Sequence, residues 1–146
     1  MRKLLIGLLL AAAACTARTT EIPVPATATV AGPRPALDAF LNAVRAQDLQ
    51  ALSEAWGDKN GAVRDRKSMP REEMEVRALY LIRCFKHDRY RVVSESPAAD
   101  SERSLQVELV RGTLTRTTNF LTTKGPDRWY VRSGELEPAR DLCTAK

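Results

Sequence analysis

The sequence predicts an α+β domain in which helices pack on a curved antiparallel sheet of about four strands. Apolar residues recur at helical spacing over residues 35–85, whereas over residues 90–133 their period changes to two. Turn-forming residues separate the extended runs, so neighbouring strands are expected to pair as hairpins. Helices followed by such a meander indicate an α+β fold. A chain of 146 residues, 44% of them hydrophobic, suits one domain plus a tail.

Two helical segments are expected to open the domain. The first starts near Pro35, a residue favoured in the first turn of a helix. Its apolar face consists of Leu37, Phe40, Leu41 and Val44. Asp48 can cap a second, shorter helix that stops at Gly57. The apolar face of that helix consists of Leu49, Leu52 and Trp56. The polar run 58–67 is predicted to be a loop.

A third helix is predicted to begin near Ser68 and Pro70 and to end by Asp88. Its core-facing stripe consists of Met74, Ala78, Leu81, Ile82 and Phe85. Because the sheet needs cover on its apolar face, this helix is the main candidate to provide it.

Four strands are predicted to follow, at residues 90–96, 105–110, 114–123 and 128–133. The third is rich in threonine, a β-branched residue that favours strands. The turns between them contain Pro97, Gly112 and the sequence Lys-Gly-Pro-Asp at 124–127. A short closing turn or helix is expected at residues 136–142.

The first fifteen residues have the pattern of a bacterial lipoprotein signal. Arg2 and Lys3 precede an uncharged apolar run, residues 4–14, that is too short to span a bilayer. Small residues directly precede Cys15, and this pattern resembles a lipobox. In a lipobox, signal peptidase cleaves the chain before the cysteine, which is acylated. An ordinary signal peptide with an incidental cysteine is the alternative.

The residue after Cys15 bears on location. Thr16 is not the Asp that retains many lipoproteins in the inner membrane, so an outer-membrane location facing the periplasm is expected.

This interpretation divides the chain into a signal peptide at 1–14, a lipidated Cys15 with a proline-rich tether to residue 34, and a single domain at 35–146. Removing the signal lowers the formal net charge from +5 to +3, since Arg2 and Lys3 are lost. No block of five or six like charges occurs, so a nucleic-acid partner is not expected. The expected partner is membrane lipid at Cys15, with an envelope protein or a small ligand at the domain.

The two remaining cysteines are expected to form a disulfide. Cys84 lies near the end of the third predicted helix and Cys143 lies in the closing segment. The oxidising envelope and the even number left after Cys15 both favour this pairing. The alternative is two free thiols, with Cys84 buried as a small hydrophobic residue.

The candidate pocket residues are Tyr80 and Arg116, which could project inward and hold a polar or anionic ligand, and the aromatic anchors Trp56 and Trp129. Each has a structural alternative: the tyrosine hydroxyl lies at a rim, the arginine extends outward, and the tryptophans pack in the core. His87, the single histidine, is expected to be a surface or capping residue, with its charged form favoured by a helix end and Asp88. The sequence contains no recognisable catalytic motif and predicts neither a metal site nor a cofactor.

The segment Ala39–Leu52 places an aromatic residue near the start of a helix, then a polar break at Gln47-Asp48, then Leu49. The last predicted strand carries Arg128-Trp129-Tyr130-Val131. Over residues 36–136 this order resembles the nuclear transport factor 2-like (cystatin-like cone) superfamily, and the region 44–57 resembles uncharacterised bacterial lipoproteins with such a domain. The resemblance implies a curved sheet wrapped around helices and a conical pocket.

Members of that superfamily include isomerases, dehydratases and cyclases as well as proteins that only bind, so the fold does not decide the function. The leading hypothesis is a membrane-anchored, non-catalytic binding domain. The alternatives are a small-molecule enzyme of the isomerase, dehydratase or cyclase type that uses the cone, and an accessory subunit that docks on an envelope protein through its sheet face.

Overall fold

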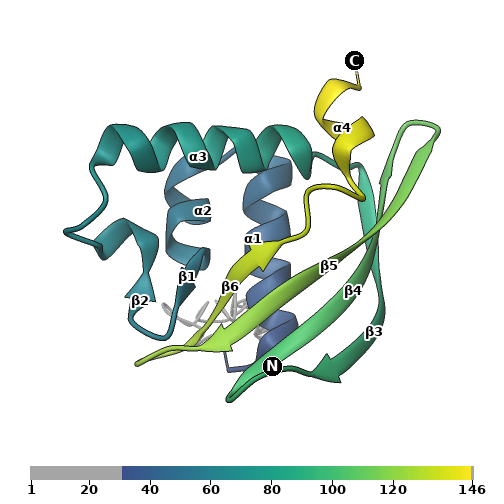
Figure 1. The fold of residues 1–146 in the computed structure, drawn as a ribbon. Helices are drawn as coiled ribbons and strands as arrows, with labels where there is room; N and C mark the ends of the chain where they lie inside the picture. Colours follow the sequence, from purple (N-terminus) through teal and green to yellow (C-terminus); the bar gives the residue numbers. More distant parts are fainter. Residues whose placement is uncertain (1–30, 146) are drawn as a thin grey trace, which may run out of the picture.

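The computed structural model describes residues 31–145. The predicted signal peptide, Cys15 and most of the tether lie outside these residues. Within them, three helices precede a four-stranded antiparallel sheet, and a short fourth helix closes the chain (Figure 1). The α+β prediction is therefore confirmed. No helix among residues 31–145 is both long enough and apolar enough to cross a membrane.

The first two helices form a hairpin, in which α1 packs on β5 and β6 of the sheet. Helix α1 spans Pro33–Ala46 and α2 spans Leu49–Ala55. Gln47 ends α1 in the left-handed conformation, and its backbone N–H donates to carbonyls in the last turn. Asp48 accepts a hydrogen bond from the Ala51 N–H at 3.0 Å, which is the predicted cap of α2. A six-residue apolar face of α1 is buried: Ala36, Leu37, Phe40, Leu41, Ala43 and Val44.

The segment predicted to be a loop contains regular structure. Strand β1 (Gly57–Asp58) pairs with β2 (Gly61–Ala62) as a small antiparallel hairpin, and a 3-10 turn, η1 (Val63–Asp65), follows it. Val63 is almost fully buried, so one apolar residue fixes an otherwise polar run against the domain. The backbone becomes extended at Trp56, so α2 ends one residue earlier than predicted. Trp56 instead forms a β-bridge with Val131.

Helix α3 spans Arg71–Cys84 and crosses the end of the α1–α2 hairpin (Figure 1). The sheet follows in the order β3 (Arg89–Pro97), β4 (Glu102–Arg111), β5 (Leu114–Lys124) and β6 (Trp129–Gly134), with every pair antiparallel. Irregular register at Val92–Ser94 and at Leu121–Thr122 increases the local twist. The sheet consequently curls around α1.

Helix α4, Arg140–Thr144, is the predicted closing element, and it packs on the end of α3. The predicted disulfide is present between Cys84 and Cys143, with their Cα atoms 3.9 Å apart. Leu142 is fully buried beneath α4. The carboxyl-terminal segment is thus fixed to the domain both covalently and by packing.

Candidate functional site

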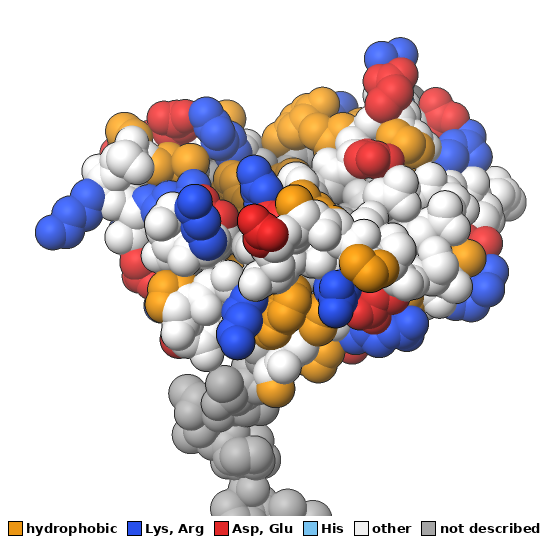
Figure 2. All heavy atoms as spheres, turned by 60° about the horizontal axis from the view of Figure 1, so that its bottom comes forward, with side chains coloured by type: hydrophobic (Ala, Val, Ile, Leu, Met, Phe, Trp, Pro, Cys, Tyr) orange, Lys and Arg blue, Asp and Glu red, His pale blue; other side chains and the backbone are white. Residues whose placement is uncertain are grey.

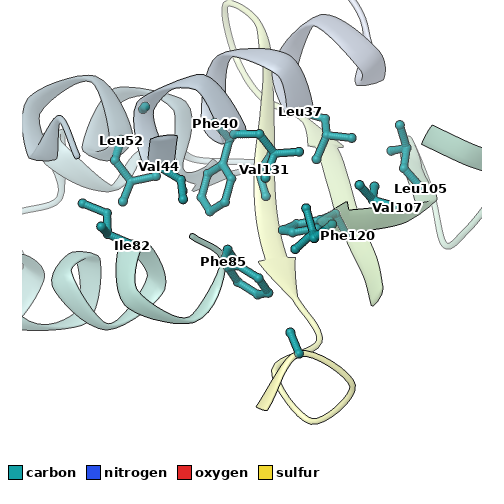
Figure 3. Packing of buried hydrophobic residues seen from close by; sticks show 14 of the residues in the cluster. Leu37, Phe40, Val44, Leu52, Ile82, Phe85, Leu105, Val107, Phe120 and Val131 are labelled. Carbon is teal, nitrogen blue, oxygen red and sulfur yellow. The ribbon is translucent and has the colours of Figure 1, made fainter. Parts of the chain in front are cut away.

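The interior of the curved sheet is filled by aromatic side chains. Phe40 from α1, Phe85 after α3 and Phe120 from β5 point toward one another (Figure 3). The Phe85 and Phe120 ring centroids are 4.8 Å apart, and the Phe40 and Phe120 centroids are 5.9 Å apart. All three side chains are almost inaccessible to water. The conical space therefore holds the hydrophobic core.

The structure does not bring Tyr80 and Arg116 together. Tyr80 is 53% exposed on the outer side of α3, so the prediction that it points into the cone is wrong. Arg116 lies on the Phe120 face of β5, but near the start of the strand, where its guanidinium binds the carboxylate of Asp141 in α4. Arg116 thus holds the closing helix.

The two tryptophans also lie in different places and have different neighbours. Trp56 is half-buried, packs against the core, and lines a shallow apolar depression with Tyr80. Trp129 is half-buried at the start of β6, opposite Lys124 on β5. The four candidate residues therefore do not form a common pocket, and only Trp56 and Tyr80 share a surface.

His87 is buried rather than on the surface, so the prediction for this residue is wrong. Only 3% of it is exposed, because the chain turns inward after α3 to enter β3. Its Nδ1 lies 2.8 Å from the Phe85 carbonyl oxygen, which can only accept, so Nδ1 carries the proton. Nε2 is buried with no hydrogen-bond partner among residues 31–145.

The neutral form of His87 is the favoured one. Burial lowers the pKa of the imidazole below its usual value, and the positive charge of Arg45 lowers it further. The hydrogen bond to Phe85 and the charge of Asp88 act in the opposite direction but do not outweigh burial. Asp88 favours the charged form, as expected, but the burial of His87, which the sequence did not indicate, outweighs it.

A part-buried polar contact lies beside this histidine. The Tyr90 hydroxyl on β3 donates to Asp38 on α1 at 2.6 Å, and the Tyr90 ring packs edge-on against His87. Burial and the Asp38 carboxylate both raise the pKa of Tyr90, so the phenol stays protonated. Asp38, Tyr90 and His87 join α1 to the sheet in a tightly packed region.

Within residues 31–145, the outer face of α3 carries the largest group of exposed apolar side chains. Val76 is 67% exposed, and Leu79 and Tyr80 are each 53% exposed. Val76 and Tyr80 line a depression of about 390 Å³ with Trp56, and Leu79 lines a separate groove of about 600 Å³. The same helix buries Ala78 and Ile82 on its other side. Helix α3 is thus apolar on two faces, of which the fold covers one.

Sequence reasoning missed Val76 and Leu79. The signal was present, since both residues fall outside the core stripe of the predicted third helix. A group of apolar residues outside the buried stripe of an amphipathic helix indicates a second contact, whereas a single one does not. Figure 2 offers a contrast: on the face that it turns forward, hydrophobic side chains lie in small groups between charged and polar ones.

The exposed side of the sheet is polar. The alternating residues of β5 that face away from the core include Thr115, Thr117 and Asn119, and Glu108 on β4 is paired with Arg91 on β3. Of the large hydrophobic residues on the sheet, Val93 is the most exposed, at 44%. Docking through the sheet face would therefore have little apolar surface to bury.

Among residues 31–145, no group of three potential metal ligands occurs. No protein-family model, curated protein or solved structure matches the chain.

Proposed function

We propose that this chain is a lipid-anchored, non-catalytic binding protein whose domain docks protein through the outer face of α3. The observation that carries the proposal is the group Val76, Leu79 and Tyr80, exposed on one helix above a filled core. Exposed apolar side chains that gather on one helix face mark an interaction surface, whereas scattered ones need no explanation. The interior is filled by side chains and leaves little space for a small molecule, whereas this surface is open to a partner.

The anchor is proposed from the sequence. The run of small residues before Cys15 supports acylation of that cysteine, and Thr16 supports delivery to the outer membrane. The geometry of the domain fits such an anchor. Helix α1 begins at the end of the domain farthest from α3 (Figure 1), so the proposed docking face would point away from the point where the tether enters.

Membership in the nuclear transport factor 2-like superfamily is also a proposal. Its support is the order of the elements and the curved sheet around α1. An enzyme of the isomerase or dehydratase type would need ionisable groups that converge on a cavity. Tyr80 and Arg116 have different neighbours, and Phe120 occupies the space between sheet and helices, so the geometry supports docking better.

The docking function is tested by photo-crosslinking in intact cells. A benzophenone amino acid at position 80 should capture protein, whereas the same probe at Thr117 on the polar sheet face should not. Adding Val76→Asp should reduce the capture at least about tenfold, because a buried unpaired carboxylate opposes apolar docking. Val93→Asp is the matched control, since it changes an exposed valine on β3 and should leave capture unchanged. Equal capture at positions 80 and 117 would contradict the proposal.

The anchor is tested separately by mass spectrometry of the mature protein. We expect an amino terminus at Cys15 that carries acyl chains. A soluble protein that starts at another residue would contradict the anchor without affecting the docking surface.

A further inference from the structure

The charges on α3 suggest what its outer face binds. Two ion pairs on the helix join Arg71 to Glu75 and Arg77 to Glu73. Glu72 at the start of the helix and Lys86 just past its end are both exposed, and neither forms an ion pair with another residue among 31–145. The helix therefore has an uncompensated negative charge near one end and an uncompensated positive charge near the other.

These two charges are placed symmetrically about the exposed Leu79. Glu72 and Lys86 each lie seven positions from Leu79, on opposite sides. Seven residues are close to two turns, so the three side chains belong to one stripe of the helix surface. Val76 and Arg83 complete this stripe at the intervening turns, and both are exposed. Lys86 lines the same groove as Leu79 and Arg83, which places it on the same side although the helix ends at Cys84.

The two ends of this stripe are complementary in charge when a second copy is turned end to end. We propose that the partner bound by this face is a second copy of the chain. The two copies form a twofold dimer in which the two α3 helices are antiparallel and cross near Leu79. Each Glu72 would then meet the partner's Lys86, about 10 Å from the axis on either side, given a rise of about 1.5 Å per residue. This inference rests on the docking function proposed above and names its partner.

The surroundings of the stripe fit this arrangement. The apolar depression is lined on α3 by Val76 and Tyr80 and the groove by Leu79 and Arg83, so a hollow borders the stripe on either side and can receive side chains of a facing helix. The groove also contains Arg111, and Cys143, Thr144 and Ala145 of the closing segment form its wall. The added positive charge of Arg83 and Arg111 favours the acidic amino-terminal end of a second α3 at this position.

The contact is expected to be small. One helix face buries less than the roughly 800 Å² per partner of a standard stable interface. The dimer is therefore expected to be weak in dilute solution and populated where anchoring confines copies to one membrane surface. The experiment consequently uses the full-length protein in its native membrane.

The test crosslinks one added cysteine with a short bismaleimide. With Leu79→Cys, a residue at the proposed axis, we expect a covalent dimer that contains peptides of this chain only. Thr117→Cys on the sheet face is the matched control and should stay monomeric. Capture of a different protein at position 79 would overturn the dimer and leave the docking function standing, whereas no capture at all would contradict both.

Charge exchange gives the decisive comparison. In the Leu79→Cys background, Glu72→Lys alone or Lys86→Glu alone should lower the dimer yield about three- to tenfold, because two exposed attractive pairs become repulsive. The double exchange Glu72→Lys/Lys86→Glu restores both pairs and should return the yield to that of the parent. A double variant no better than either single one, or single variants without effect, would overturn the antiparallel pairing.

Discussion

The disulfide between Cys84 and Cys143 joins the last residue of α3 to the short helix α4 across 59 positions of sequence. Arginine side chains reinforce the same junction. Arg83 donates to the Cys143 carbonyl at 2.8 Å, and Arg111 donates to the Leu142 carbonyl at 2.7 Å. The closing helix is thus held by a covalent bond, by buried Leu142 and by hydrogen bonds to its carbonyl oxygens.

Removing the disulfide should destabilise the protein without releasing α4 completely. For Cys84→Ser/Cys143→Ser we expect the free energy of unfolding to fall by about 2–4 kcal/mol, since a closed loop of this length restricts the unfolded chain. Urea unfolding monitored by circular dichroism measures the change. Wild-type protein with a reductant is the control and should lose a similar amount. Unchanged stability in both samples would contradict a native disulfide.

Gly134 illustrates how tightly the aromatic core is packed. A Cβ atom at this position would lie 2.6 Å from Cζ of Phe85 and 2.7 Å from Cε1 of Phe120. Gly134→Ala should therefore lower the free energy of unfolding by about 1–3 kcal/mol through overpacking. Thr117→Ala, an exposed change on β5, is the control. Gly112→Ala would not serve, because the positive φ of Gly112 would strain an alanine. A Gly134→Ala protein as stable as wild type would show that the core has unfilled space.

Much of the fold could be predicted from sequence because its signals are local. The helical spacing of Leu37 and Phe40 and the alternation of Leu105 and Val107 report the period of each element directly. The hairpin at 57–62 could not be predicted in this way, since its strands are two residues long and depend on packing by Val63. Short elements of this kind are fixed by tertiary contacts rather than by periodicity.

The site was harder to predict than the fold, and His87 shows why. Its neighbours in sequence, Lys86 and Asp88, are charged and suggest a surface position, yet the turn between α3 and β3 carries only His87 inward. Tyr80 is the converse case: an aromatic residue on a core helix suggests burial, but it lies on the face that the fold leaves open. Which face of α3 is covered depends on its packing against α1, α2 and α4, and no local pattern records it.

The hydrogen bond from Tyr90 to Asp38 should contribute to stability because both residues connect α1 to β3. Tyr90→Phe removes the hydroxyl and leaves the carboxylate to recruit water, so we expect a loss of about 1–2 kcal/mol. Asp38→Ala should cost a similar amount, since it leaves the part-buried hydroxyl without its acceptor. The coupling between the two changes is measured in a double-mutant cycle by urea unfolding. Strictly additive losses would show that the two groups do not interact.

His87 should make the protein less stable at mildly acidic pH. In the folded state its pKa lies below the usual 6.5, chiefly because of burial, so between pH 6.5 and the lowered value the unfolded chain binds more protons than the folded one. This contribution to stability is fully present above about pH 6.5 and decreases as the pH falls below it. Protonation would place a charged N–H at the buried Nε2, which has no acceptor among residues 31–145 and is close to the positive charge of Arg45.

The measurement compares urea unfolding of wild type and His87→Gln between pH 7.5 and 5. Glutamine can donate to the Phe85 carbonyl as the imidazole does, but it does not titrate in this range. We expect wild type to lose more stability than the variant as the pH falls, with the difference beginning near pH 6.5. His87 is the only histidine in the chain, so no other imidazole can produce this difference. Parallel stability curves for the two proteins would contradict the depressed pKa, and a wild type that gains stability on acidification relative to the variant would reverse its sign.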